Sequence, residues 1–194
     1  MRELSLHILD LLENALEAEA TRVEVRIDED LAADQMSISV RDNGRGMDQE
    51  IANRALDPFF TTRTTRHVGL GLPLLAAAAQ RCEGGVQLES VPEQGTMVTA
   101  TFRYSHLDRA PLGNVADTLL ACLLARDGKA PQLCFQHCVN GTSFTLDTAA
   151  IQAEVGDIPL SYPPLRNWLR DLINEVEAEL ASLRGGQNAK AQDN

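Results

Sequence analysis

The stretch LSLHILDLLENALEAEATRVEV, residues 4–25, decides the fold, because it joins an amphipathic helix directly to a strand. Apolar side chains recur every three or four residues and form one face of the helix, at Leu4, Ile8, Leu11, Leu12 and Ala15. The opposite face is a polar stripe of Glu3, His7, Asp10, Asn14 and Glu17. This pattern predicts a helix that buries its apolar face in the core.

Two members of the polar stripe, Asp10 and Asn14, lie one helical turn apart. A carboxylate can activate a water molecule and an amide oxygen can ligate Mg²⁺, so this pair suits a site that hydrolyses ATP. The alternative is a solvated helix face without a function. Motifs further along the chain decide between the two interpretations.

Composition limits the classes of partner. The chain has 194 residues, of which 44% are hydrophobic, and a formal net charge of −11. The charge argues against nucleic acid or an anionic membrane as a partner, because phosphate contacts need clustered Lys and Arg. No apolar run has transmembrane length, and the chain begins with an acidic amphipathic helix instead of a secretory signal, which predicts a cytoplasmic protein.

Hydrophobic periodicity predicts the elements of the first hundred residues. Strands are expected at 21–28, 35–41, 86–91 and 96–104, and helices at 48–56, with Asp48 as its cap, and from residue 70 to Gly84-Gly85. The order helix, two strands, helix, two strands predicts an α+β two-layer sandwich. In such a fold a mixed sheet is covered by helices on one face.

A boundary is predicted near residues 105–111, beyond which the pattern starts again. The expected units are a first domain at 1–104, a small α+β domain at 105–184 and a disordered polar tail at 185–194. In the second unit, strands at 132–139 and 142–147 flank an Asn140-Gly141 turn. A helix at 161–183 carries an apolar stripe with Trp168, which we expect in the core, although an exposed part of it could form a homodimer.

The four cysteines, Cys82, Cys122, Cys134 and Cys138, are expected to be reduced thiols. The run from Cys134 to Cys138 contains His137, but it lacks a second pair of ligands at zinc-finger spacing. On a strand, Cys134 and Cys138 would point to the same face as core residues. A metal site is therefore not predicted there.

Three motifs follow the polar stripe: DNGRGMD at 42–48, a glycine loop at 69–71 that opens a helix, and Gly95-Thr96 at the start of a strand. Asp42 can accept a hydrogen bond from the exocyclic amine of adenine, and Thr96 offers a hydroxyl to adenine or to a water bound to it. Gly44 and Gly46 let the backbone approach the base.

The glycine loop suits the phosphates of the same nucleotide. The backbone N–H groups of Gly69, Leu70 and Gly71 lie at a helix N-terminus, where they favour a triphosphate. The signature GxxxxGK[ST] is absent, so a P-loop is excluded.

The four motifs in this order resemble the GHKL superfamily, the Bergerat-fold ATPases of gyrase, heat-shock chaperone, histidine kinase and MutL type, over about residues 3–103. ENALEAEATRVEV is similar to the N-box of MutL-type proteins, DNGRGMD to the first glycine box, and DPFFTTR and HVGLGLPL to the phenylalanine box and second glycine box of histidine kinases. The resemblance implies a mainly antiparallel sheet, and ATP and Mg²⁺ as cofactors. It also implies that Asn14 is the metal ligand and that Asp10 occupies the general-base position.

The resemblance further implies an ATP lid in the threonine-rich stretch before Gly69. The lid residues expected to bind ATP are Thr61, Thr62 and Arg63. Arg63 and Arg66 either reach the γ-phosphate or are solvated loop residues. Phe59 and Phe60 are expected to anchor the lid to the core.

The chain departs from the resemblance at three points. Asp10 stands where hydrolytic relatives usually carry Glu, one methylene longer, which predicts good binding and slow hydrolysis. Glu17 stands where histidine kinases usually carry Lys. No dimerisation helix with a phosphoacceptor His precedes the N-box, so a self-contained sensor kinase is not expected. His7 either takes part in proton or phosphoryl transfer, or is a surface residue or a hydrogen-bond partner of a carboxylate.

Two functions are compatible with these residues. The first is a Mg-ATP-binding protein of the histidine-kinase-like ATPase class, which hydrolyses ATP slowly or passes the phosphoryl group to a partner protein. The second is a non-catalytic, nucleotide-gated interaction module that regulates a protein partner through residues 105–184.

Overall fold

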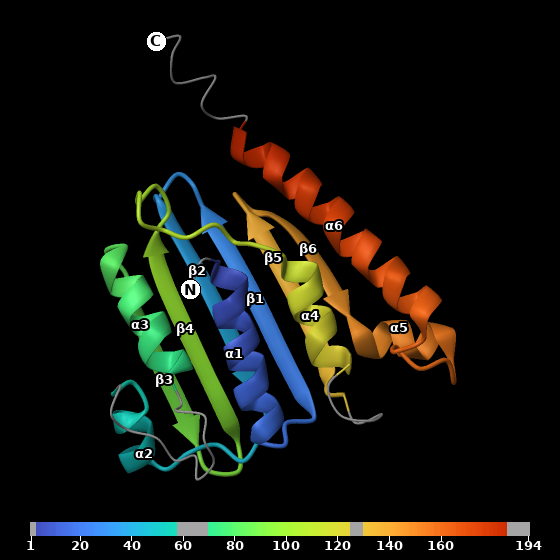
Figure 1. Ribbon diagram of the computed structural model, residues 1–194, viewed down its shortest axis with the longest axis horizontal. Coiled ribbons are helices and arrows are strands. Elements are labelled where there is room, and N and C mark those ends of the chain that lie inside the picture. Colours follow the sequence, from blue (N-terminus) through green and yellow to red (C-terminus); the bar gives the residue numbers. More distant parts are fainter. Residues whose placement is uncertain (1–2, 58–69, 125–129, 186–194) are drawn as a thin grey trace.

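The structure, a computed structural model, describes residues 3–57, 70–124 and 130–185. These residues form one six-stranded sheet in the order β3-β4-β2-β1-β5-β6, and helices cover one face of it (Figure 1). The strands are β1 (Arg22–Asp30), β2 (Gln35–Asp42), β3 (Gly85–Val91), β4 (Gly95–Arg103), β5 (Gln132–Val139) and β6 (Thr142–Asp147). The helices are α1 (Leu4–Glu17), α2 (Gln49–Arg54), α3 (Gly71–Arg81), α4 (Val115–Leu124), α5 (Thr148–Val155) and α6 (Pro163–Gly185). Across this part of the chain, none of the helices combines the length and apolar character that crossing a membrane requires.

Most neighbouring strands of the sheet are antiparallel, and β1 and β5 form the parallel pair. The predicted sandwich with a mixed, mainly antiparallel sheet under one helical layer is therefore confirmed. Strands β5 and β6 extend the sheet that the first hundred residues build, and their inward side chains belong to the same hydrophobic core. Packing is thus continuous across residues 104 and 105, where the sequence predicts a boundary.

Helix α1 lies at the centre of the helical layer, between α3 and α4 (Figure 1). Its predicted apolar face is buried, with at most 5% exposure at Leu4, Ile8, Leu11, Leu12 and Ala15. Burying such a side chain contributes roughly 1.5–3 kcal/mol. The opposite side of the helix is therefore fixed in orientation by the core.

The segment after β4 caps the N-terminus of α1. Leu4 and Ser5 donate their backbone N–H groups to the carbonyl oxygens of Pro111 (2.9 Å) and Leu112 (2.7 Å). The first N–H groups of a helix have no partner within the helix, so these carbonyl oxygens satisfy two of them. The position of α1 therefore depends on residues beyond 105.

A buried charge network joins α6 to the sheet. His137 of β5 is fully buried, with Nε2 3.0 Å from Oε1 of Glu29 in β1 and Nδ1 2.7 Å from Oε1 of Glu177 in α6. Arg184 of α6 donates to both oxygens of Glu29, at 2.8 and 2.7 Å. Ionised carboxylates only accept hydrogen bonds, so both ring nitrogens of His137 must donate, and the ring is an imidazolium.

Two expectations about burial are wrong. Cys134 and Cys138 share the partly exposed face of β5, whereas His137 lies on the buried face, where its Nδ1 contacts Glu177 of α6. The three therefore cannot share a metal ion, and within residues 3–57, 70–124 and 130–185 no cluster of His, Cys, Asp or Glu could hold one. Trp168 is 50% exposed, because α6 turns Leu169 and Ile173 into the core instead.

Candidate functional site

Three polar side chains, which we call the polar row, cross one end of the sheet. Asp42 ends β2, Thr96 is its partner in β4, and Ser90 of β3 is the partner of Thr96. Side chains alternate between the two faces of a strand, and these three are in phase with the buried residues Val40 and Val98. The polar row therefore points to the helix-covered face of the sheet.

The carboxylate of Asp42 is held by backbone donors. Its Oδ1 accepts the N–H of Gly44 at 2.8 Å. Burial raises the pKa of Asp42, and hydrogen bonds from the backbone N–H groups of Gly44 and Thr96 oppose that shift. An ionised carboxylate has about four acceptor positions, so Asp42 keeps capacity for a donor on a ligand.

The loop after Asp42 packs against the end of α1. Arg45 donates its N–H to the carbonyl oxygen of Ala18 at 2.9 Å. Gly44 is buried so close to Ala18 that a Cβ added to it would lie 2.6 Å from the same carbonyl oxygen. These contacts hold the polar row beside the helix that carries Asp10 and Asn14.

Gly46 is required by the course of this loop. Its φ is +63°, in the left-handed region, and a Cβ there would overlap with the carbonyl group of Val91 in β3. The Cβ positions of Gly44 and Gly46 thus face protein atoms, so loop packing explains why glycine stands at both. A contact of either glycine with a base stays a prediction.

Asp10 faces the first residue of α3. A Cβ built on Gly71 would lie 3.0 Å from Cβ and 3.2 Å from Oδ2 of Asp10. The carboxylate therefore lies at the N-terminus of α3, where backbone N–H groups carry partial positive charge. The N-cap residue is Leu70, whose apolar side chain cannot cap these groups. The Asp10 carboxylate and the backbone N–H donors of α3 thus lie together at the N-terminus of α3.

Along α1, Asn14 lies between the N-terminus of α3 and the polar row. It follows Asp10 by one turn of α1 and precedes Ala18, which the Asp42 loop contacts, by one turn. At 1.5 Å per residue, Asp10 and Ala18 are about 12 Å apart along the helix.

Several predicted site residues lie outside the described part of the chain. They are Thr61, Thr62, Arg63 and Gly69, together with Phe59, Phe60 and Arg66. Leu70 and Gly71 are described: Gly71 is the first residue of α3 and Leu70 its N-cap, one residue from the predicted start.

His7 differs from the expected surface residue. It is 4% exposed, and its Nδ1 has no hydrogen-bond partner among the residues that the structure describes. Burial disfavours the charged ring and lowers the pKa of His7 to about 4. His7 is therefore a neutral, enclosed side chain one turn before Asp10.

Two residues that hold the site together were not predicted from the sequence. Ser90 accepts the backbone N–H of Met47 at 2.8 Å, which ties β3 to the Asp42 loop. Asn43 accepts backbone N–H groups at the start of β1, from Thr21 (2.9 Å) and Arg22 (2.8 Å). The sequence contains one indication of the role of Ser90, namely a hydroxyl-bearing residue at a position of a strand that is expected to face the core.

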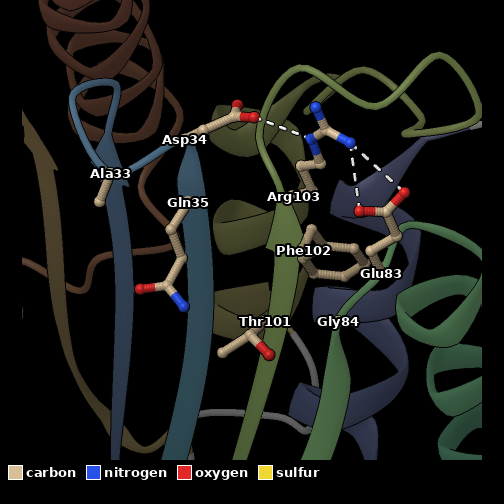
Figure 2. Close-up of a pocket in the computed structure, with 8 residues that line it drawn as sticks. All are labelled: Ala33, Asp34, Gln35, Glu83, Gly84, Thr101, Phe102 and Arg103. Atoms are coloured by element: carbon tan, nitrogen blue, oxygen red, sulfur yellow. Dashed lines mark hydrogen bonds and ion pairs between the residues drawn. The ribbon is translucent and has the colours of Figure 1, made fainter.

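A pocket of about 290 Å³ lies at the opposite end of β2 and β4 from Asp42 and Thr96 (Figure 2). Arg103 points between two carboxylates there and donates to Asp34 at 2.9 Å and to Glu83 at 3.1 Å. Ion pairs as exposed as these contribute little to stability. The pocket is separate from the polar row and does not belong to the same site.

Comparison with known proteins gives one family match. Residues 2–106 match the family described as histidine kinase-, DNA gyrase B- and HSP90-like ATPases. The match covers α1 to β4 and ends next to the predicted boundary. It therefore includes every residue of the candidate site.

Curated relatives are similar over the same region. The sensor protein kinase FleS of Pseudomonas aeruginosa is 41% identical over 110 residues, which are 57% of this chain and 27% of FleS. The signal transduction histidine-protein kinase AtoS of Escherichia coli is 36% identical over 93 residues, 47% of this chain and 15% of AtoS. A putative sensor protein of Shewanella frigidimarina is 32% identical over 103 residues, 52% of this chain and 16% of its own length. The chain thus spans no more than 27% of the length of these relatives.

Among solved structures, the N-terminal domain of a DNA repair protein is similar with a TM-score of 0.49 at 15% identity, over 76% of this chain and 53% of that chain. This likeness is too weak to bear on function.

Proposed function

This chain belongs to the family of histidine kinase-, DNA gyrase B- and HSP90-like ATPases, and we propose that it binds Mg-ATP between α1, the N-terminus of α3 and the polar row. The observation that carries the proposal is the contact of Asp10 with Gly71. It places a carboxylate next to helix N–H groups, which attract phosphate. Asp10 would then be the carboxylate beside the triphosphate that could serve as a general base.

The roles proposed for individual residues follow their places along α1. Asn14 would ligate Mg²⁺ through its amide oxygen, because Mg²⁺ prefers oxygen ligands. Asp42 would accept a hydrogen bond from the adenine amine, with Thr96 beside it. The residues proposed to bind ATP are Asn14, Asp42, Gly44, Gly46, Thr61, Thr62, Arg63, Gly69, Leu70, Gly71 and Thr96.

We propose Asp10 as the general base for either of two acceptors of the phosphoryl group. Water as the acceptor gives slow hydrolysis, and a hydroxyl or imidazole of a partner protein gives phosphotransfer. The names of FleS and AtoS describe kinases. More specifically, we propose that this chain phosphorylates a protein in the cytoplasm.

A second candidate function is a nucleotide-gated interaction module. The observation that favours it is the capping of α1 by Pro111 and Leu112. Helix α1 carries proposed ATP-binding residues and contacts both α4 and the segment with Pro111 and Leu112. A shift of α1 on ATP binding would therefore move α4 and this segment. Residues 105–184 would then signal nucleotide binding to a protein partner, or to a second copy of the chain through α6, where Trp168 is half exposed.

Radiolabelled ATP separates these functions. The full chain and its Asp10→Asn variant are incubated with γ-labelled ATP, alone and with a cell extract of the source organism, and α-labelled ATP serves as the control for retained nucleotide. Phosphotransfer predicts γ-label, but no α-label, on a protein band with wild type only. Hydrolysis predicts labelled inorganic phosphate. Tight binding with neither product favours the interaction module, and no binding contradicts the proposal.

A further inference from the structure

The hydroxyl group of Ser90 has three polar partners. It accepts the backbone N–H of Met47 at 2.8 Å, lies 3.1 Å from the carbonyl oxygen of Gly95 and lies 2.9 Å from Oγ1 of Thr96. Ser90 and Thr96 are direct cross-strand partners in β3 and β4. The three contacts are close enough for all of them to be hydrogen bonds.

All three contacts can be hydrogen bonds in only one arrangement of the protons. A serine hydroxyl has one hydrogen and two lone pairs. The Met47 N–H can only donate and the Gly95 carbonyl can only accept, so in this arrangement Ser90 donates to Gly95 and Thr96 donates to Ser90. The hydrogen of Thr96 is then used, and its lone pairs remain.

We propose that Ser90 is a positioning residue that determines base specificity: by taking the hydroxyl proton of Thr96, it leaves Thr96 with acceptor lone pairs only. Asp42, the partner of Thr96 in β2, is also an acceptor. The inference rests on the proposed ATP site at this end of the sheet.

Two neighbouring acceptors distinguish between purines where they face the C6 substituent of the base. Adenine carries an amine donor at C6, and guanine carries a carbonyl acceptor there. With C6 facing Asp42 and Thr96, the adenine amine would donate to these acceptors, while the guanine carbonyl would face their lone pairs. A Thr96 hydroxyl free to rotate could donate to that carbonyl, so the bond to Ser90 removes the option that would admit GTP.

Ser90 also anchors Met47, and the two roles have different signatures. Loss of the Met47 anchor loosens the Asp42 loop and should weaken ATP and GTP alike. Release of the Thr96 proton should change the ratio of the two dissociation constants. Only the second effect depends on Thr96 having a hydroxyl.

The test is calorimetric titration of the full chain with Mg-ATP and with Mg-GTP. The proteins are wild type, Ser90→Ala, Ser90→Thr, Thr96→Val and the double variant Ser90→Ala/Thr96→Val, each checked for folding by circular dichroism. Ser90→Ala should lower the ratio Kd(GTP)/Kd(ATP) by about 3- to 10-fold, the equivalent of one hydrogen bond. Ser90→Thr should keep the wild-type ratio, and Ser90→Ala should change nothing further in the Thr96→Val background.

Two results would overturn the inference alone. One is an unchanged ratio in Ser90→Ala, and the other is the same fall in the ratio with or without the Thr96 hydroxyl. A wild-type chain that binds no ATP would instead overturn the proposed function, and the inference with it.

Discussion

Asp10 and Gly71 lie so close together that a Cβ added to Gly71 would be only 3.0 Å from Cβ of Asp10, tighter than an ordinary contact. This contact joins the middle of α1 to the start of α3, two helices that the chain separates by the strand pair β1–β2, α2 and the predicted lid. A side chain at position 71 would press against the Asp10 carboxylate. The geometry of Asp10 should therefore be sensitive to the residue at position 71.

Gly71→Ala is expected to separate stability from activity. Ala favours a helix over Gly by roughly 1 kcal/mol, so the free energy of unfolding in urea should hold or rise. The added Cβ displaces the Asp10 carboxylate, and ATP turnover should fall by about tenfold or more. Gly85→Ala is the matched control, because a Cβ at Gly85 meets nothing within 4 Å. Wild-type turnover in Gly71→Ala would contradict the role given to this contact.

Asp10→Asn is expected to abolish turnover and keep ATP affinity, because a general base stabilises the transition state rather than the bound substrate. Asp10→Glu should keep turnover, or raise it if the shorter side chain limits reach. Single-turnover hydrolysis and equilibrium binding measure the two quantities. Unchanged hydrolysis and phosphotransfer in Asp10→Asn would leave the interaction module as the better function.

Asn14→Ala is expected to abolish the Mg²⁺-dependent part of ATP binding while the fold stays intact, because an oxygen ligand of the metal is lost. Titration of ATP with Mg²⁺ and with excess chelator separates that part from the rest. If the variant binds Mg-ATP as wild type does, the metal is held elsewhere.

Periodicity and turn chemistry were enough to predict most of the fold. The buried face of α1 and the turn at Asn140 and Gly141, both with positive φ, follow from local sequence. Which strands pair with each other does not follow from local sequence, because pairing joins segments that are distant in the chain. The parallel pairing of β1 with β5, from Arg22–Gln132 to Glu29–Val139, has no signature in either strand alone.

Site residues were predictable where the chemistry is local to a motif. The types and spacing of Asp10, Asn14 and Asp42 predict them as site residues, and their roles stay a prediction. Ser90 could not be predicted in this way, because its importance depends on Met47 and Thr96 meeting it from other segments. Glu29 and Arg184, 155 residues apart, became partners only through the docking of α6 on the sheet. Burial of His137 between two carboxylates depends on the same docking.

The His137 network should make stability depend on pH. Burial alone would lower the pKa of His137, but hydrogen bonds to Glu177 and Glu29 outweigh it and raise the pKa. A histidine whose pKa is higher in the folded chain stabilises the fold while it is charged. This stabilisation is complete below the pKa of the unfolded chain, about 6.5, and it is lost as the pH rises through the pKa of the folded chain. For Glu29, burial would raise the pKa, but bonds from His137 and Arg184 lower it, so its contribution is lost only as the pH falls into the acid range.

The free energy of unfolding of wild type should therefore fall as the pH rises above about 6.5, and it should fall further than that of His137→Gln. The variant should also be about 1–3 kcal/mol less stable near pH 6, because Glu29 and Glu177 each lose a charged hydrogen-bond donor, while Arg184 still pairs with Glu29. Urea unfolding at a series of pH values measures both effects. Parallel curves for the two proteins would show that His137 is not charged in the folded state.

The central claim is that Mg-ATP binds with its base at Asp42, and calorimetric titration of a non-hydrolysable ATP analogue tests it most directly. Wild type should bind one equivalent. Asp42→Asn should bind about tenfold or more weakly, since a hydrogen bond to a charged acceptor is worth roughly 1.5–3 kcal/mol. Asp34→Asn, at the opposite end of the same sheet, should bind as wild type does. No binding by wild type, or equal affinity in Asp42→Asn, would contradict the claim.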